Sequence, residues 1–120
     1  MSTVFDVPKA LQEQQGEFLS ELRKKNGKLR IGVNEVTKAI ERDQAKLVVI
    51  AQDVNPKELT MHLPLLCKEK KIPYSFMGSK KELGEKSGLG VGTAAVAVVE
   101  PGDAQNELET LAKKLMELAK

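Results

Sequence analysis

The segment Leu47–Ala51 constrains the fold more than any other part of this chain. Its five residues, Leu-Val-Val-Ile-Ala, are all apolar and three of them are β-branched. Such a run is typical of a strand that is buried on both faces, because alternate side chains of a strand point to opposite sides of the sheet. The chain is therefore expected to hold a sheet between two layers of helices.

Strand and helix patterns alternate along the rest of the chain. Further strands are expected at residues 29–31, 74–77 and 93–99. Helices are expected from about Pro8 to residue 25, from Asn34 to Arg42, from Asn55 through Leu66, from Ser79 to Lys86, and after Gly102 through Leu118. Asn26-Gly27 is the stop signal of the first helix, and Ser79 with Glu82 forms a capping box at the start of the fourth. This order predicts an α/β fold, a three-layer α/β/α sandwich with a mixed sheet of about four strands. The length of 120 residues suits one domain, residues 1–120.

Pro64 falls inside the third expected helix. A proline in a helix interior removes one backbone hydrogen bond and clashes with the preceding turn. We therefore expect this helix to be kinked or split at Pro64.

Composition excludes several classes of protein. Aromatic residues make up only 3% and Trp is absent, which argues against nucleic-acid binding by base stacking on aromatic side chains. Cys67 is the single cysteine and permits no intramolecular disulfide. No apolar run is long enough for a membrane span or a signal peptide, so we expect a cytoplasmic protein without a membrane partner. The closing helix has no coiled-coil seam, and we expect a monomer when free.

Candidate catalytic and cofactor groups are few. His62 and Cys67 have no second ligand nearby in sequence, and a lone cysteine is more often a small core residue. The glycines of Gly88-Leu89-Gly90-Val91-Gly92 precede a strand, whereas a dinucleotide fingerprint precedes a helix. This segment is either a structural turn or a flexible lip that lets a ligand approach the backbone. We expect no catalytic residue, no metal and no cofactor.

The segment Gly32-Val33-Asn34-Glu35-Val36-Thr37-Lys38 gathers polar groups at an expected helix start. Asn34 is a good N-cap, Glu35 suits the positive end of the helix dipole, and Lys38 follows one turn later on the same face. The set matches a guanine edge, where N1–H and N2–H₂ donate while O6 and N7 accept. Ordinary helix capping is the alternative explanation.

Charge is concentrated around this segment. Eight cations and three acids lie between Arg23 and Lys46, which gives +5 in a chain whose total is +2. Charge segregated in this way is typical of a surface that binds nucleic acid, although a solvated helix face can also be basic.

Five segments spread over most of the chain carry a family resemblance. They are Gly32 to Lys38, Leu47 to Ala51, His62-Leu63-Pro64-Leu65-Leu66-Cys67, Ile72-Pro73-Tyr74 and Leu83-Gly84. Together they resemble the kink-turn RNA-binding family of archaeal ribosomal protein L-seven-Ae. The resemblance implies the same α/β/α sandwich and explains His62, Pro64 and Cys67 as framework residues.

The resemblance also implies a set of RNA-binding residues. In this family an Asn-Glu-x-x-Lys segment contacts guanines of tandem sheared G·A pairs in a sharply bent RNA loop. The corresponding residues here are Asn34, Glu35 and Lys38. Gly32 corresponds to a position near the RNA backbone. An apolar surface for an extruded nucleotide corresponds to Leu59, Leu89, Gly90, Val91, Thr93 and Ala94. Phosphate contacts correspond to Lys28, Arg30, Arg42 and Lys80.

Three positions depart from the family pattern. Ile31 stands where the family often has lysine, Gly90 replaces a common acidic residue, and Asp43 replaces a glycine. The change at Gly90 lies in the loop that tunes discrimination among RNAs in this family.

The implied function is that of a non-enzymatic protein of the large ribosomal subunit that binds kink-turns in ribosomal RNA, box C/D and H/ACA guide RNAs and ribonuclease P RNA. Guide-particle core proteins are partners by resemblance only. One alternative is a sister protein of the same fold that is restricted to the ribosome. A small enzyme or nucleotide-binding protein, based on the glycine loop or Cys67, is a more distant alternative.

Overall fold

The computed structural model describes residues 7–54 and 60–118, which form a mixed sheet of four strands. The strands are β1 (Lys28–Ile31), β2 (Leu47–Ala51), β3 (Tyr74–Met77) and β4 (Ala95–Glu100), in the order β1-β4-β2-β3. Strands β1 and β2 pair antiparallel with β4, while β2 and β3 pair in parallel. Strands β1, β2 and β3 therefore all end at the same edge of the sheet.

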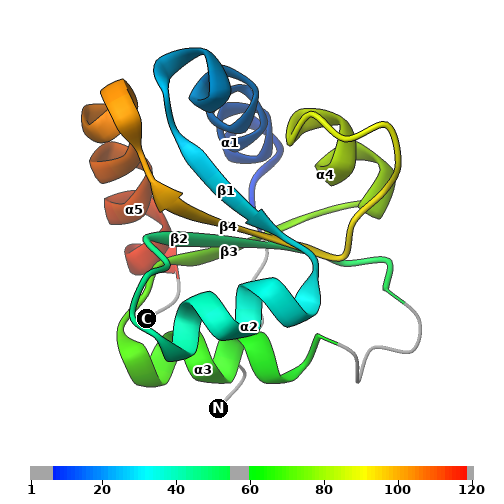
Figure 1. Cartoon of the computed structure of the whole chain (residues 1–120), viewed down its shortest axis with the longest axis vertical. Helices are drawn as coiled ribbons and strands as arrows, with labels where there is room; N and C mark the ends of the chain where they lie inside the picture. The colour runs from blue at the N-terminus through cyan, green and yellow to red at the C-terminus, as the bar shows by residue number, and fades with distance from the viewer. Residues whose placement is uncertain (1–6, 55–59, 119–120) are drawn as a thin grey trace.

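Helices cover both faces of this sheet. They are α1 (Lys9–Leu22), α2 (Val33–Glu41), α3 (His62–Lys70), α4 (Lys80–Lys86) and α5 (Gln105–Leu118), with 3-10 turns η1 (Arg23–Lys25) and η3 (Gly102–Ala104). Figure 1 shows α2 and α3 on one face, with α1, α4 and α5 on the other. The predicted three-layer sandwich and its mixed sheet are confirmed.

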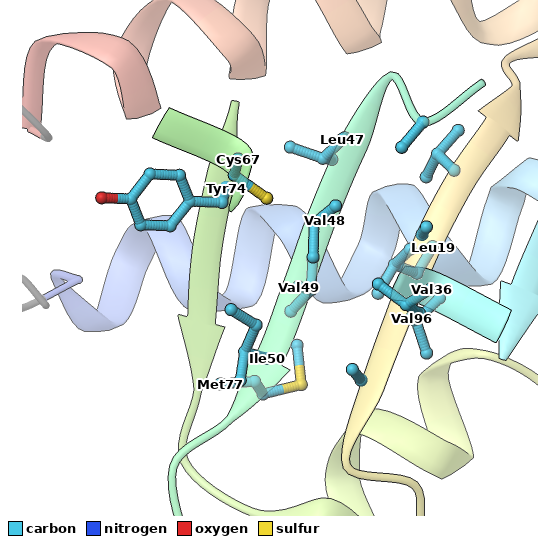
Figure 2. Packing of buried hydrophobic residues seen from close by; sticks show 14 of the residues in the cluster. Leu19, Val36, Leu47, Val48, Val49, Ile50, Cys67, Tyr74, Met77 and Val96 are labelled. Atoms are coloured by element: carbon cyan, nitrogen blue, oxygen red, sulfur yellow. The ribbon is translucent and has the colours of Figure 1, made fainter. Parts of the chain in front are cut away.

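The core lies on both sides of β2. All five of its residues are buried, as the apolar run predicted. Figure 2 shows Leu19 of α1 and Val36 of α2 near Val96 of β4, the strand next to β2, and both are fully buried. Burial of each large side chain of this kind contributes about 1.5–3 kcal/mol. Side chains from both helical layers therefore belong to one hydrophobic core with β2 and β4.

The end of α1 follows the predicted stop signal. Asn26 has φ 63°, and the Gly27 N–H donates to Leu22 O at 2.8 Å. Asp43, where the family usually has glycine, also lies in the left-handed region with φ 57°. Asp is one of the few residues other than glycine that tolerates this conformation.

Pro64 does not interrupt the described helix α3. The described helix α3 begins at His62, and the expected start at Asn55 lies outside the described residues. Pro64 thus belongs to the first turn, where backbone N–H groups have no partner within the helix. It costs no helical hydrogen bond there, and α3 continues to Lys70.

A buried polar cluster lies beside β3, the outermost strand on one side of the sheet. Gln15 of α1 is fully buried, and its Nε2 donates to Phe76 O at 2.7 Å. Ser75 Oγ donates to Gln15 Oε1 at 2.6 Å. The side chain of Gln15 thereby hydrogen-bonds to a carbonyl of an edge strand, a kind of strand that can pair with another chain.

Among the described residues, no helix has both the length and the apolar composition of a membrane span.

Candidate nucleic-acid interface

Three helices begin at the edge of the sheet where β1, β2 and β3 end. Helix α2 follows β1, α3 follows β2 and α4 follows β3, while β4 starts at this same edge (Figure 1). The first N–H groups of a helix lack intrahelical partners and carry partial positive charge. This edge therefore has the electrostatic character of an anion-binding surface.

Backbone hydrogen bonds join the start of α2 to the start of β4. The Gly32 N–H donates to Ala95 O at 2.9 Å, and the Ala51 N–H donates to Ala94 O at the same distance. Residues that are far apart in sequence, at positions 32, 51 and 94–95, are thus fixed side by side.

The start of α4 is tied to the same place. The Thr93 N–H donates to Lys80 O at 3.1 Å, and the Lys80 N–H donates to Asp53 Oδ1 at 2.8 Å. Thr93 itself is buried, and its hydroxyl donates to Ala95 O at 3.2 Å. Its side chain therefore holds the base of the loop and is not presented on the surface. Strand β4 begins at Ala95, two residues later than predicted, since Thr93 bonds to α4.

Helix α2 begins one residue earlier than its polar residues suggested. Gly32 is the N-cap with φ 99°, and its carbonyl accepts the first helical bond from the Val36 N–H at 2.9 Å. The prediction of Asn34 as N-cap is therefore wrong. Asn34 is the second residue of the helix, and the N-cap Gly32 has no side chain with which to cap this start. The amide of Asn34 is exposed instead of being used for capping.

Glu35 and Lys38 lie on the same exposed face, as predicted. Their side chains are 54% and 57% exposed, and Lys38 Nζ lies 3.6 Å from Glu35 Oε1. An exposed pair of this kind contributes at most about 1 kcal/mol, so a ligand can replace it at low cost. The N-terminal half of α2 thus offers the amide of Asn34 and the carboxylate of Glu35 in its first turn, with the ammonium group of Lys38 one turn later.

The glycine-rich loop is packed against α4. The Leu89 N–H donates to Gly84 O at 2.8 Å, and a Cβ at Gly84 would collide with Val91 O. The loop was interpreted either as a structural turn or as a flexible lip. Its ends agree with a structural turn, because they are held on α4. Its middle is exposed: Val91 is 73% accessible and Leu89 is half-buried.

The predicted phosphate contacts do not all lie at this edge. Arg30 is exposed in β1, two residues before Gly32, and Lys80 is the first residue of α4. Lys28 is at the opposite end of β1, 3.6 Å from Glu100 Oε2. Arg42 ends α2, about 13 Å along the axis from its start. Leu59 lies outside the described residues.

An apolar hollow of about 160 Å³ lies beside the edge, between the end of β2 and the start of α3. It is lined by Ile50, Ala51, Gln52, Val54, Thr60, Met61, Pro64 and Phe76. Hydrophobic periodicity predicted several of these residues as core but gave no sign of a hollow.

One polar contact at this edge had no sequence signal. His62 Nε2 of α3 lies 2.9 Å from Thr37 Oγ1 of α2, and that hydroxyl is 2.8 Å from Val33 O. Thr37 and His62 are 25 residues apart, and nothing in a single sequence pairs them.

Cys67 has the environment of a core residue. It is fully buried, and desolvation raises the pKa of its thiol to about 12. The thiol is therefore protonated at neutral pH and is a poor nucleophile or metal ligand. Within the described part of the chain, no three His, Cys, Asp or Glu side chains are grouped so that they could hold a metal ion.

Comparison with known proteins matches residues 14–108 to the model of the ribosomal protein L7Ae/L30e/S12e/Gadd45 family. The chain belongs to this family. Among solved structures it is similar to the Giardia lamblia 15.5kD RNA binding protein, with a TM-score of 0.87 and 29% sequence identity. The match covers 93% of this chain and 92% of the Giardia protein. The family match includes every residue described above at this edge, from Arg30 to Ala95.

Proposed function

We propose that this chain is a non-enzymatic RNA-binding protein that recognises kink-turn RNA through the first turn of α2. The observation that carries the proposal is the exposure of Asn34, Glu35 and Lys38 in the N-terminal half of a helix whose N-cap is a glycine. Family membership and the Giardia lamblia neighbour, which is described as RNA binding, support the same class of function.

The three side chains complement a guanine edge. Carboxylate oxygens of Glu35 accept from guanine N1–H and N2–H₂, while the ammonium group of Lys38 donates to O6 or N7. The Asn34 amide supplies one further donor and one acceptor. Because the Glu35–Lys38 pair is weak and exposed, its replacement by base contacts costs little.

Other groups at the same edge suit the rest of a bent RNA. Arg30, Lys80 and the N-termini of the helices provide positive charge for phosphates. Leu89 and Val91 offer an apolar surface for an unstacked nucleotide, on the loop that leads from α4 to β4. Base recognition would thus be set within a shell of phosphate contacts.

We propose no enzymatic role because the described residues offer little reactive chemistry. The Cys67 thiol is buried and protonated, and the His62 ring contacts Thr37 at 2.9 Å.

Ribosomal RNA of the large subunit, box C/D and H/ACA guide RNAs and ribonuclease P RNA are the proposed ligands, with guide-particle core proteins as further partners. All these RNAs would present the same bent loop to α2, so their ranking is best measured directly. Sequencing of RNA that copurifies with the protein from native cells gives that ranking.

A gel-shift titration tests the proposal. One kink-turn RNA is compared with the same RNA in which Watson–Crick pairs replace the tandem G·A pairs. We expect the replacement to abolish tight binding and to leave only salt-sensitive, nonspecific binding. Equal affinity for the two RNAs would reject kink-turn recognition.

A further inference from the structure

Helix α2 begins without an N-cap side chain of the kind that usually stabilises the start of a helix. Its N-cap is Gly32, which has no side chain to accept from the first N–H groups. Asn34 and Glu35 lie in this first turn, and their use in base recognition requires a fixed backbone. A first turn without a side-chain cap frays more readily than a capped one.

Thr37 and His62 supply a different support for this turn. Thr37 Oγ1 lies 2.8 Å from the carbonyl oxygen of Val33, the first residue of α2, and 2.9 Å from His62 Nε2 of α3. Val33 O can only accept, and the hydroxyl has one proton. Both contacts are hydrogen bonds only if Thr37 donates to Val33 O and accepts from a protonated His62 Nε2.

This assignment links the two helices at the edge of the sheet. The ring of His62 and the hydroxyl of Thr37 are half-buried, so the bonds are partly shielded from water. Val36 of α2 and Leu63 of α3 are fully buried in the same hydrophobic core, and the two helices pack against each other. The first carbonyl of α2 is thereby attached to α3 through two successive hydrogen bonds.

We propose that His62 and Thr37 are positioning residues for RNA recognition, and that they hold the first turn of α2 in the geometry that Asn34, Glu35 and Lys38 need. This inference rests on the proposed function. Neither side chain contacts the RNA in this proposal. Breaking the link increases the motion of the first turn and lowers the affinity that depends on its geometry.

Thr37→Val and His62→Leu test the link, with Thr37→Ser and His62→Gln as variants that keep the hydroxyl or a side-chain donor. Thr110→Val is the matched control, because Thr110 Oγ1 makes the same bond to the carbonyl four residues earlier, Asn106 O at 3.0 Å, on α5. Affinity is measured for kink-turn RNA and for the RNA with replaced G·A pairs, well below the melting temperature of each variant.

We expect Thr37→Val and His62→Leu each to weaken kink-turn binding by about three- to tenfold, the effect of one net hydrogen bond. Binding to the replaced RNA should be unchanged, and the double variant should be no weaker than either single variant. Thr37→Ser, His62→Gln and Thr110→Val should bind like the wild type. In the free protein, long-range ¹H–¹⁵N spectra should show the proton of His62 on Nε2.

The possible failures are distinct. A wild-type protein that binds both RNAs equally rejects the proposed function and the positioning role with it. A wild type that discriminates, with variants that still bind normally or that weaken both RNAs alike, rejects the positioning role alone. A neutral His62 ring with its proton on Nδ1 rejects the hydrogen-bond assignment on which the inference is built.

Discussion

Helices α2 and α4 begin at the same edge of the sheet but use their polar residues differently. At the start of α4, Ser79 Oγ accepts from the Glu82 N–H at 3.1 Å, and Asp53 Oδ1 accepts from the Lys80 N–H at 2.8 Å. Side chains therefore satisfy two of the first N–H groups of α4. At the start of α2, the N-cap Gly32 has no side chain for capping, and Asn34 and Glu35 in the first turn are exposed.

This difference separates a supporting helix from one that is available for a ligand. The polar groups at the start of α4 stabilise the fold, because their bonding capacity is used within the protein. Asn34 could cap a helix as well as Ser79 by residue type, but Gly32 occupies the capping position. We therefore expect substitutions around α4 to change mainly stability and substitutions in α2 to change mainly RNA affinity.

The largest expected effect on stability is that of Gly84→Ala in α4. The added Cβ would collide with Val91 O and lie 2.9 Å from Gly92 Cα, and backbone atoms cannot move aside as a flexible side chain can. We expect the free energy of unfolding to fall by about 3 kcal/mol, at the upper end of overpacking effects. Urea denaturation measures it.

Gly78→Ala is the control for this prediction, because its Cβ would meet only Gln12 Oε1 at 4.0 Å. If the two variants were equally stable, the loop would not be packed on α4 as described.

Glu35→Ala tests the other side of the comparison. We expect it to weaken kink-turn binding by about 1–3 kcal/mol, the value of a good base contact, with little change in stability. Removal of an anion should slightly improve nonspecific RNA binding. Fluorescence anisotropy with the two RNAs measures both effects.

Glu41→Ala is the matched control, since Glu41 is an exposed acid at the other end of the same helix. If Glu35→Ala raised the affinity for both RNAs as Glu41→Ala should, Glu35 would have no role in guanine recognition.

Ser79→Ala should act only on the supporting helix. Removal of the cap should lower the free energy of unfolding by about 1 kcal/mol, and Ser79→Asn, which retains an acceptor, should recover most of it. The affinity ratio between the two RNAs should stay unchanged, as measured by anisotropy. A changed ratio with unchanged stability would reverse the roles assigned to α4 and α2.

Most elements of the fold were predictable because local patterns determine them. The apolar run of β2, the Ser79 cap and the Asn26 stop each depend on a few neighbouring residues, and each is confirmed. The start of α2 was misjudged by local reasoning, since Asn34 and Gly32 are both acceptable caps. Gly32, the actual N-cap, also forms a tertiary hydrogen bond from its N–H to Ala95 O.

The candidate site was predictable in its residues but not in its arrangement. Sequence identified Glu35 and Lys38 as one face because helical spacing is regular. The family resemblance grouped Lys28 with Lys80 as phosphate contacts, although Lys28 lies at the start of β1 and Lys80 at the start of α4, because a match of sequence segments gives no distance between residues. The link between Thr37 and His62 depends on how two helices pack, which no local pattern encodes.

Lys80→Ala and Lys28→Ala measure how far the RNA extends from the edge. Lys80 begins α4 beside the glycine loop, whereas Lys28 is at the far end of β1 and 3.6 Å from Glu100 Oε2. Removal of a lysine that binds a phosphate should make the slope of log affinity against log salt shallower by less than about one unit. We expect this change for Lys80→Ala and a smaller one for Lys28→Ala. Equal changes would extend the interface along β1, and unchanged slopes would assign both lysines to solvated surface.

Gly90→Ala should have the smallest effect and tests whether the exposed middle of the loop contacts RNA. Gly90 is not among the residues with positive φ, and a Cβ there meets nothing within 4 Å. Alanine should therefore stabilise the fold by up to about 1 kcal/mol, because it lowers the conformational entropy of the unfolded chain. It should also slightly improve kink-turn affinity by restricting the loop before binding.

Leu89→Ser should weaken binding, since a nucleotide would lose its apolar surface. Amide exchange at residues 88–94, with and without kink-turn RNA, should show slower exchange in the complex. Unchanged exchange together with normal binding by Leu89→Ser would exclude this loop from the interface and leave recognition to α2 alone.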